Sequence, residues 1–131
     1  MPTKVVAAAA RILLGLSFCV FGLNGFLHFL KAPLPSGTAG QFAGAMFGSS
    51  FHYLVFGVQF VSGALLLANR FVVLATVLLG AVIANILMFH IAMQPDGIAP
   101  GLIELVLWFI VAFQVRSQLA PLFASKLAKQ V

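Results

Sequence analysis

The sequence predicts an all-α fold, an integral membrane four-helix bundle with a 20-residue outer loop (residues 31–50) between its first two helices. The composition is 63% hydrophobic and only 7% charged, whereas about a quarter of the residues of a soluble domain are charged. Four apolar segments are each close to the ~20 residues that a helix needs to cross ~30 Å of hydrocarbon. Since lipid offers no partners for free backbone groups, such segments fold as helices. The 131 residues are expected to form a single transmembrane domain.

Turn signals bound the predicted spans. The dipeptide Asn69-Arg70 separates the second span from the third, residues 94–97 (Gln-Pro-Asp-Gly) close the third, and Pro121 follows the fourth. The first apolar run is interrupted by Arg11 and is then too long for a signal-peptide core, so we expect it to be retained. The predicted spans cover about residues 12–30, 51–68, 71–93 and 98–119.

The outer loop is rich in Gly, Ala and Pro. Thr38 can cap a short helix that carries Phe42 and Met46 on one face, four residues apart. We therefore expect an interfacial or shallow re-entrant segment that lies over the bundle.

The basic residues indicate the orientation. Six of the seven flank the predicted cytoplasmic side: Lys4, Arg11, Arg70, Arg116, Lys126 and Lys129. Only Lys31 falls on the other side, so the positive-inside rule places both termini in the cytoplasm of a bacterial plasma membrane. The basic residues form no stripe, which argues against a nucleic-acid partner. Cys19 is the single cysteine, so no disulfide within the chain and no CxxC pair exists.

A few polar or amphipathic side chains lie inside the predicted spans, in the outer half or near the midplane. Polar groups in lipid are costly and usually face the bundle interior. We therefore predict a ligand-binding layer. Its residues are Asn24, His28, His52, Gln59, Asn85, His90, Glu104 and Trp108.

Helical phase orients part of this layer. Ser17, Asn24 and His28 share one face at spacings of seven and four. Asn85 and His90 are five apart and point in different directions, so we expect Asn85 inside and leave His90 between the pocket and the interface.

Glu104 is the only acidic residue inside a predicted span. A bare carboxylate there would be expensive, so we expect it to be protonated or paired, facing the interior near Asn24 or His28. Trp108, one turn away, would shield it from water.

The chemistry of the layer favours a small amphipathic ligand. The three histidines lie on three helices without an HxxxH pair or a thiolate, which disfavours haem and predicts no metal site. Apolar walls around a few hydrogen-bonding groups suit a quinone-like molecule. No catalytic constellation is present, and the polar groups could instead serve only to hold the helices together. Small residues mark possible packing seams at Gly15, Gly22 and Gly80-x-x-x-Ala84.

Several stretches resemble the DoxX-like family of small four-helix membrane proteins. They are RILLGLSFCVFGLNGFLHFL (residues 11–30), GALLLANRFVVLA (63–75) and ANILMFHIAMQPDGIAPG (84–101). The resemblance implies a bundle in the plasma membrane and a link to membrane redox systems, since the family is named after a subunit of a thiosulfate:quinone oxidoreductase. Many such sequences carry Glu in the second span where this chain has Gln59.

Together, the residues and the resemblance suggest an accessory or quinone-binding subunit of a membrane redox system. The alternative is a structural or assembly subunit without a ligand of its own. Either would act within a larger membrane complex or a homo-oligomer.

Overall fold

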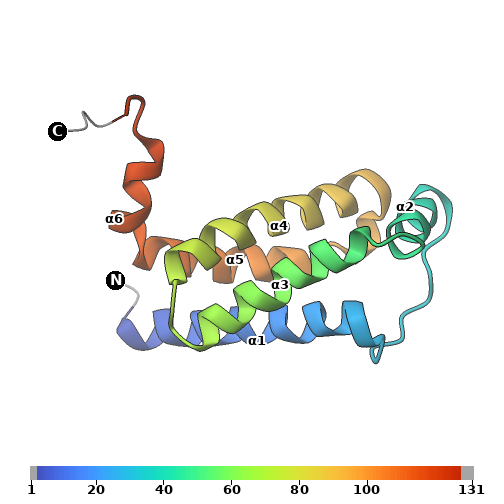
Figure 1. Cartoon of the computed structure of the whole chain (residues 1–131), viewed down its shortest axis with the longest axis horizontal. Helices are drawn as coiled ribbons and strands as arrows, with labels where there is room; N and C mark the ends of the chain where they lie inside the picture. The colour runs from blue at the N-terminus through green and yellow to red at the C-terminus, as the bar shows by residue number, and fades with distance from the viewer. Residues whose placement is uncertain (1–2, 128–131) are drawn as a thin grey trace.

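The computed structural model describes residues 3–127, and this part of the chain contains helices and no strands (Figure 1). The predicted all-helical class is confirmed. The helices are α1 (Lys4–Leu27), α2 (Gly37–Phe47), α3 (Phe51–Leu67), α4 (Val72–Met93), α5 (Ala99–Gln114) and α6 (Arg116–Leu119), with 3-10 turns η1 (Pro95–Gly97) and η2 (Ala120–Phe123).

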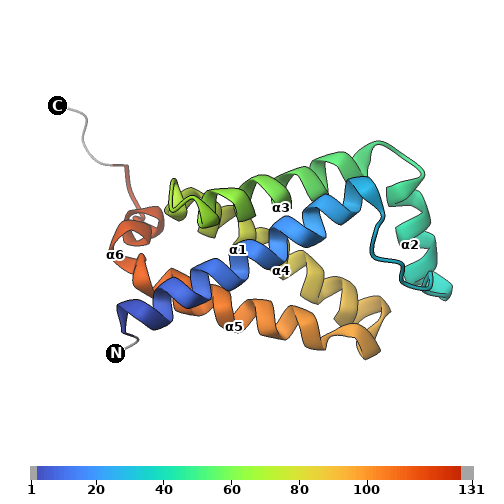
Figure 2. The same cartoon turned by 90° about the horizontal axis from the view of Figure 1, so that it is seen from below.

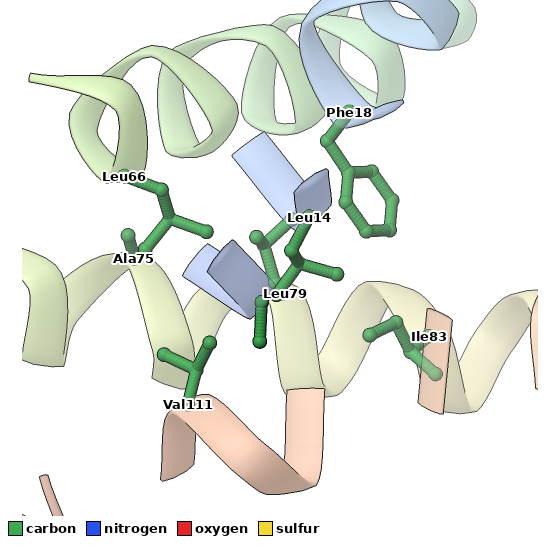
Figure 3. Packing of buried hydrophobic residues seen from close by; sticks show 8 residues of the cluster. Leu14, Phe18, Leu66, Ala75, Leu79, Ile83 and Val111 are labelled. Carbon is green, nitrogen blue, oxygen red and sulfur yellow. The ribbon is translucent and has the colours of Figure 1, made fainter. Parts of the chain in front are cut away.

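The four longer helices pack around one apolar core. Helix α1 lies against α3 and α5, and α4 lies against the same two helices from the other side (Figures 1 and 2). Figure 3 shows side chains from all four helices meeting in this core. Its largest fully buried members are Leu14, Phe18, Leu66, Leu79, Ile83 and Val111.

The outer faces of these helices are also apolar. Large side chains such as Leu13 of α1, Val61 of α3 and Phe109 of α5 are more than half exposed. Helices α1 and α4 are long and apolar enough to cross a membrane. Two further spans are possible if α2 with α3, and α5 with Arg116–Phe123, each count as one segment bent by 87° and 83°. The described part of the chain thus holds two to four candidate membrane spans.

Helix α1 starts well before the predicted residue 12. The Thr3 hydroxyl caps it by accepting the Val6 N–H at 3.3 Å. The Arg11 guanidinium donates to the Leu66 carbonyl at the end of α3, where a cation also complements the helix dipole. Both basic residues of this segment therefore lie within the helix and not before it.

Helix α5 ends at Gln114, earlier than the predicted residue 119, because the chain leaves helical geometry at Val115 (φ −101°, ψ 15°). The following segment turns away by 83°. The middle helices lie close to prediction, α3 over Phe51–Leu67 against 51–68 and α4 over Val72–Met93 against 71–93.

The short helix expected in the outer loop is present as α2. It begins at Gly37, whose φ of +63° favours glycine, with Ser36 in the cap position. The prediction that Thr38 caps it is wrong, because Thr38 already lies in its first turn. Phe42 packs on Phe89 of α4 with ring centroids 5.5 Å apart. Helix α2 therefore crosses the ends of α3 and α4 (Figure 2).

The two ends of the molecule differ in charge. The start of α1, the α3–α4 turn and α6 lie at one end, opposite α2 (Figure 1). Lys4, Arg11, Arg70 and Arg116 belong to the first end, which we call the basic end, and Lys31 precedes α2 at the other. Lys129, which we also assigned to the basic side, lies outside the described residues.

Candidate functional site

The predicted polar layer separates into several small groups. Asn24 is used at the end of α1, where its carbonyl accepts the His28 N–H at 2.8 Å and its Oδ1 accepts the Leu30 N–H at 2.7 Å. His28 terminates the helix in the left-handed region (φ 52°) and is exposed. The asparagine side chain therefore satisfies a backbone N–H just beyond the helix, while the His28 N–H satisfies one of the last carbonyls of α1.

An aromatic cluster forms where α2 meets α1 and α3. The Phe47 ring of α2 lies 5.6 Å from the His28 ring, 5.5 Å from the His52 ring and 5.6 Å from the Phe56 ring. His52 is 8% exposed, and its Nδ1 is 2.7 Å from the Ser49 carbonyl oxygen. Because a carbonyl only accepts, Nδ1 is the donor of this bond. This cluster brings two of the predicted histidines onto one phenylalanine.

Glu104 faces the interior, as expected, but with a different partner. Its Oε1 accepts a hydrogen bond from the Ser17 hydroxyl of α1, and its Oε2 is buried without a partner in residues 3–127. The expectation that Asn24 or His28 would be that partner is wrong. Ser17 lies ten residues before the end of α1, about 15 Å along the axis, so the glutamate sits well below the α1 end.

Trp108 joins α5 to α4. Its indole N–H donates to the Thr76 carbonyl at 2.7 Å. A Cβ on Gly80 would come within 2.9 Å of the same ring, so only glycine lets α4 approach this closely. Of the predicted seam Gly80-x-x-x-Ala84, the glycine packs beneath Trp108 while Ala84 is exposed.

Asn85 does not face the interior. It is exposed on the outer side of α4, where its Nδ2 donates to the Ala81 carbonyl at 2.8 Å. The expectation that Asn85 lies inside is wrong, because α4 is apolar on every side and its sequence gives little indication of which face is buried. His90, left open between the pocket and the interface, is half-buried at the end of α4, with its Nδ1 3.0 Å from the Gln94 carbonyl oxygen.

Two buried polar residues lie along one side of α3. Gln59 is 5% exposed and Ser62 is fully buried, with no partner for its hydroxyl among residues 3–127. Glycines allow α3 to pack closely on α1, since a Cβ on Gly63 would come within 2.8 Å of the Gly15 carbonyl oxygen. Gly22, the other seam residue, packs against Phe60.

Two hollows in the described part of the chain lie away from the predicted site residues, although Ser62 lines the second of them. The larger, of 630 Å³, is an open apolar groove between the start of α4 and the α6–η2 segment, lined by residues that include Phe71, Val77, Gln118 and Leu122. The second, of 280 Å³, lies between α3 and α4 and includes Tyr53, Ser62 and Leu78. None of the eight predicted residues lines either hollow.

Sequence reasoning placed four contributors outside the candidate site: Ser17, Phe47, Ser62 and Thr76. The spacing of seven between Ser17 and Asn24 was the available signal for the first. Thr76 contributes a backbone carbonyl, for which no residue-type signal exists.

Among residues 3–127, no three His, Cys, Asp or Glu side chains come together in a group that could hold a metal ion. No known protein family, no curated protein and no solved structure matches the chain. The resemblance to the DoxX-like family therefore stays a prediction.

Proposed function

We propose that the chain is an integral membrane protein in which α1, α3, α4 and α5 cross the bilayer as a four-helix bundle, with the basic end in the bacterial cytoplasm. Helices α1 and α4 have 24 and 22 residues, and α3 and α5 have 17 and 16. These lengths correspond to about 36, 33, 25 and 24 Å, around the ~30 Å of the hydrocarbon layer.

The bent segments support this placement. Helix α2 turns by 87° from α3 at one end, and the α6–η2 segment turns by 83° from α5 at the other. Segments at right angles to spanning helices suit the two interfaces of a bilayer. Arg116, at the start of α6, keeps its guanidinium over the Phe113 ring at 4.2 Å, an arrangement typical of an interfacial anchor.

Within this bundle, we propose a structural or assembly role in a larger membrane complex, of the redox-associated kind that the DoxX-like resemblance implies. One observation carries the choice over a ligand-binding role: most of the predicted site residues bond within their own chain. The bonds join Asn24 and Leu30, His52 and Ser49, Asn85 and Ala81, His90 and Gln94, Glu104 and Ser17, and Trp108 and Thr76.

The second candidate is the quinone-binding subunit, and Glu104 favours it. Its buried Oε2 has no partner in the described part of the chain. A carboxyl oxygen of this kind can bond the carbonyl or hydroxyl of a quinone head group.

Extraction of the chain from its native membrane in mild detergent separates the two candidates. The structural role predicts a chain that elutes in a stoichiometric complex larger than itself and whose organic extract holds less than about one quinone per ten chains. One quinone per chain, lost on Glu104→Leu but retained on Gln114→Leu, would favour the second candidate.

A further inference from the structure

Within residues 3–127, Asn85 is the exposed polar residue of the four long helices that lies far from a helix end. The other exposed polar groups of the four long helices lie within three residues of a helix end, as Tyr53 and Gln114 do. Asn85 instead lies within one turn of the midpoint of α4, the most apolar of these helices. If α4 crosses the bilayer, as proposed above, its amide faces the hydrocarbon near the midplane, where an unsatisfied polar group is costly.

The bond to Ala81 satisfies only part of this amide. One N–H of Nδ2 donates to the Ala81 carbonyl. A second N–H and the two lone pairs of Oδ1 are left for bonds outside the helix. The group can therefore donate and accept at once.

Asn85 belongs to a row of residues on α4 whose spacing is typical of two helices that pack together. A seam runs along α4 at alternating spacings of four and three residues, and we call it the α4 seam: Leu74, Leu78, Ala81, Asn85, Met88 and Ala92. All but the half-buried Leu78 are exposed. This spacing is that of a left-handed helix pair, and Ala81, one turn before Asn85, permits close approach of a second helix.

We propose that the α4 seam is the contact with a second copy of this chain, paired in parallel about a twofold axis along the bilayer normal. Such an axis places identical residues at the same depth, so Asn85 meets Asn85 of the partner subunit. Each amide then donates to the other's oxygen, so that every N–H of both side chains is bonded and each Oδ1 accepts one bond. A polar asparagine within an apolar seam fixes register and oligomeric state in this way.

The occupant is a second copy because the seam carries no charge, and because its one polar group is complementary to itself. An unrelated partner would have to present a side chain that both donates and accepts at that depth, whereas a parallel copy always does so. This inference rests on the proposed membrane placement. It identifies a second copy of the chain as one partner in the proposed structural role.

Disulfide trapping in vesicles tests the proposal with the full chain. In a Cys19→Ala background, Ala81→Cys reports on the α4 seam, and Val106→Cys is the matched control at the middle of the exposed face of α5. The vesicles contain phosphatidylcholine with phosphatidylglycerol at a low protein-to-lipid ratio. Oxidation should yield at least about tenfold more disulfide-linked dimer for Ala81→Cys than for Val106→Cys.

Adding Asn85→Leu should lower that dimer yield about tenfold, the equivalent of about 1.4 kcal/mol. Adding Gln114→Leu, which removes an exposed amide at a helix end, should leave it unchanged. Equal trapping at both cysteines, or trapping that is insensitive to Asn85→Leu, would overturn the proposal. Resistance to alkaline carbonate extraction is measured in parallel: an inserted chain without dimer refutes the seam alone, and a chain released by carbonate refutes the membrane placement as well.

Discussion

Glu104 and Asn85 are both polar residues within apolar helices, yet their surroundings are opposite. Glu104 of α5 turns inward onto the Ser17 hydroxyl of α1. Asn85 of α4 turns outward and bonds only its own helix backbone. The difference follows from how each helix distributes its apolar residues. Helix α5 has a distinguishable inner side, whereas α4 is apolar all round, so neighbours alone decide which of its faces is buried.

A larger side chain should lower the free energy of unfolding much more on the inner side of α4 than on its outer side. The loss on the inner side is the largest effect that we expect. Gly80→Leu forces atoms into the Trp108 ring, which already lies 2.9 Å from where a Cβ would stand. We expect it to lower the free energy of unfolding by about 3 kcal/mol. Thermal unfolding of the full chain in mild detergent measures this loss.

The control for that substitution is Ala84→Leu, on the exposed side of the same helix. It should change the stability of the monomer by less than about 0.5 kcal/mol. Similar losses for both variants would mean that α4 is buried on both sides and that the contrast with Asn85 is wrong.

Removal of each polar group sharpens the comparison further. Glu104→Leu leaves the Ser17 hydroxyl without its partner inside the bundle, so we expect a loss of about 2 kcal/mol. Asn85→Leu buries nothing and should leave monomer stability unchanged or slightly higher. Urea or SDS titration of both variants gives the two values, and a greater loss at Asn85 would reverse the assignment of inside and outside.

Trp108→Phe tests the α4–α5 contact with a smaller effect. The substitution keeps an aromatic ring over Gly80 and removes the indole N–H that donates to the Thr76 carbonyl. One hydrogen bond of this kind contributes about 1 kcal/mol. An unchanged midpoint of thermal unfolding would show that the bond is not formed in the membrane protein.

A small effect is also expected for Glu104→Gln. The amide oxygen can still accept from the Ser17 hydroxyl, so stability should fall by less than about 0.5 kcal/mol. Pairing of Glu104 with a charged His28 would instead make this substitution cost several kcal/mol. The structure argues against that pairing, since His28 is exposed at the helix end beside Phe47.

The sequence identified the middle helices well because strong signals bound them. Asn69-Arg70 and Gln94-Pro95 interrupt the apolar runs, and α4 begins and ends within one residue of the predicted span. The start of α1 was predicted too late because Lys4 and Arg11 were interpreted as flanking charges. The end of α5 was predicted too late because no glycine or proline marks the bend at Val115.

The candidate site was less predictable because it depends on rotation of helices about their axes. Depth counted from the ends of the spans placed Glu104 level with Asn24 and His28, but Glu104 bonds Ser17, ten residues before the end of α1. The bonding partner of Glu104 depends on how far α1 extends beyond the start of α5. The contact of Trp108 with the Thr76 carbonyl involves backbone. Neither of these leaves a pattern in residue types.

Reporter fusions test the proposed membrane placement. Alkaline phosphatase fused after Val131 is expected to be inactive in bacterial cells, because we propose that the basic end is cytoplasmic. The same reporter inserted after Ser49, beside α2 at the opposite end, should be strongly active. Strong activity after Val131 with an inactive reporter after Ser49 would contradict the orientation, and equal activity at both positions would contradict the arrangement of crossings.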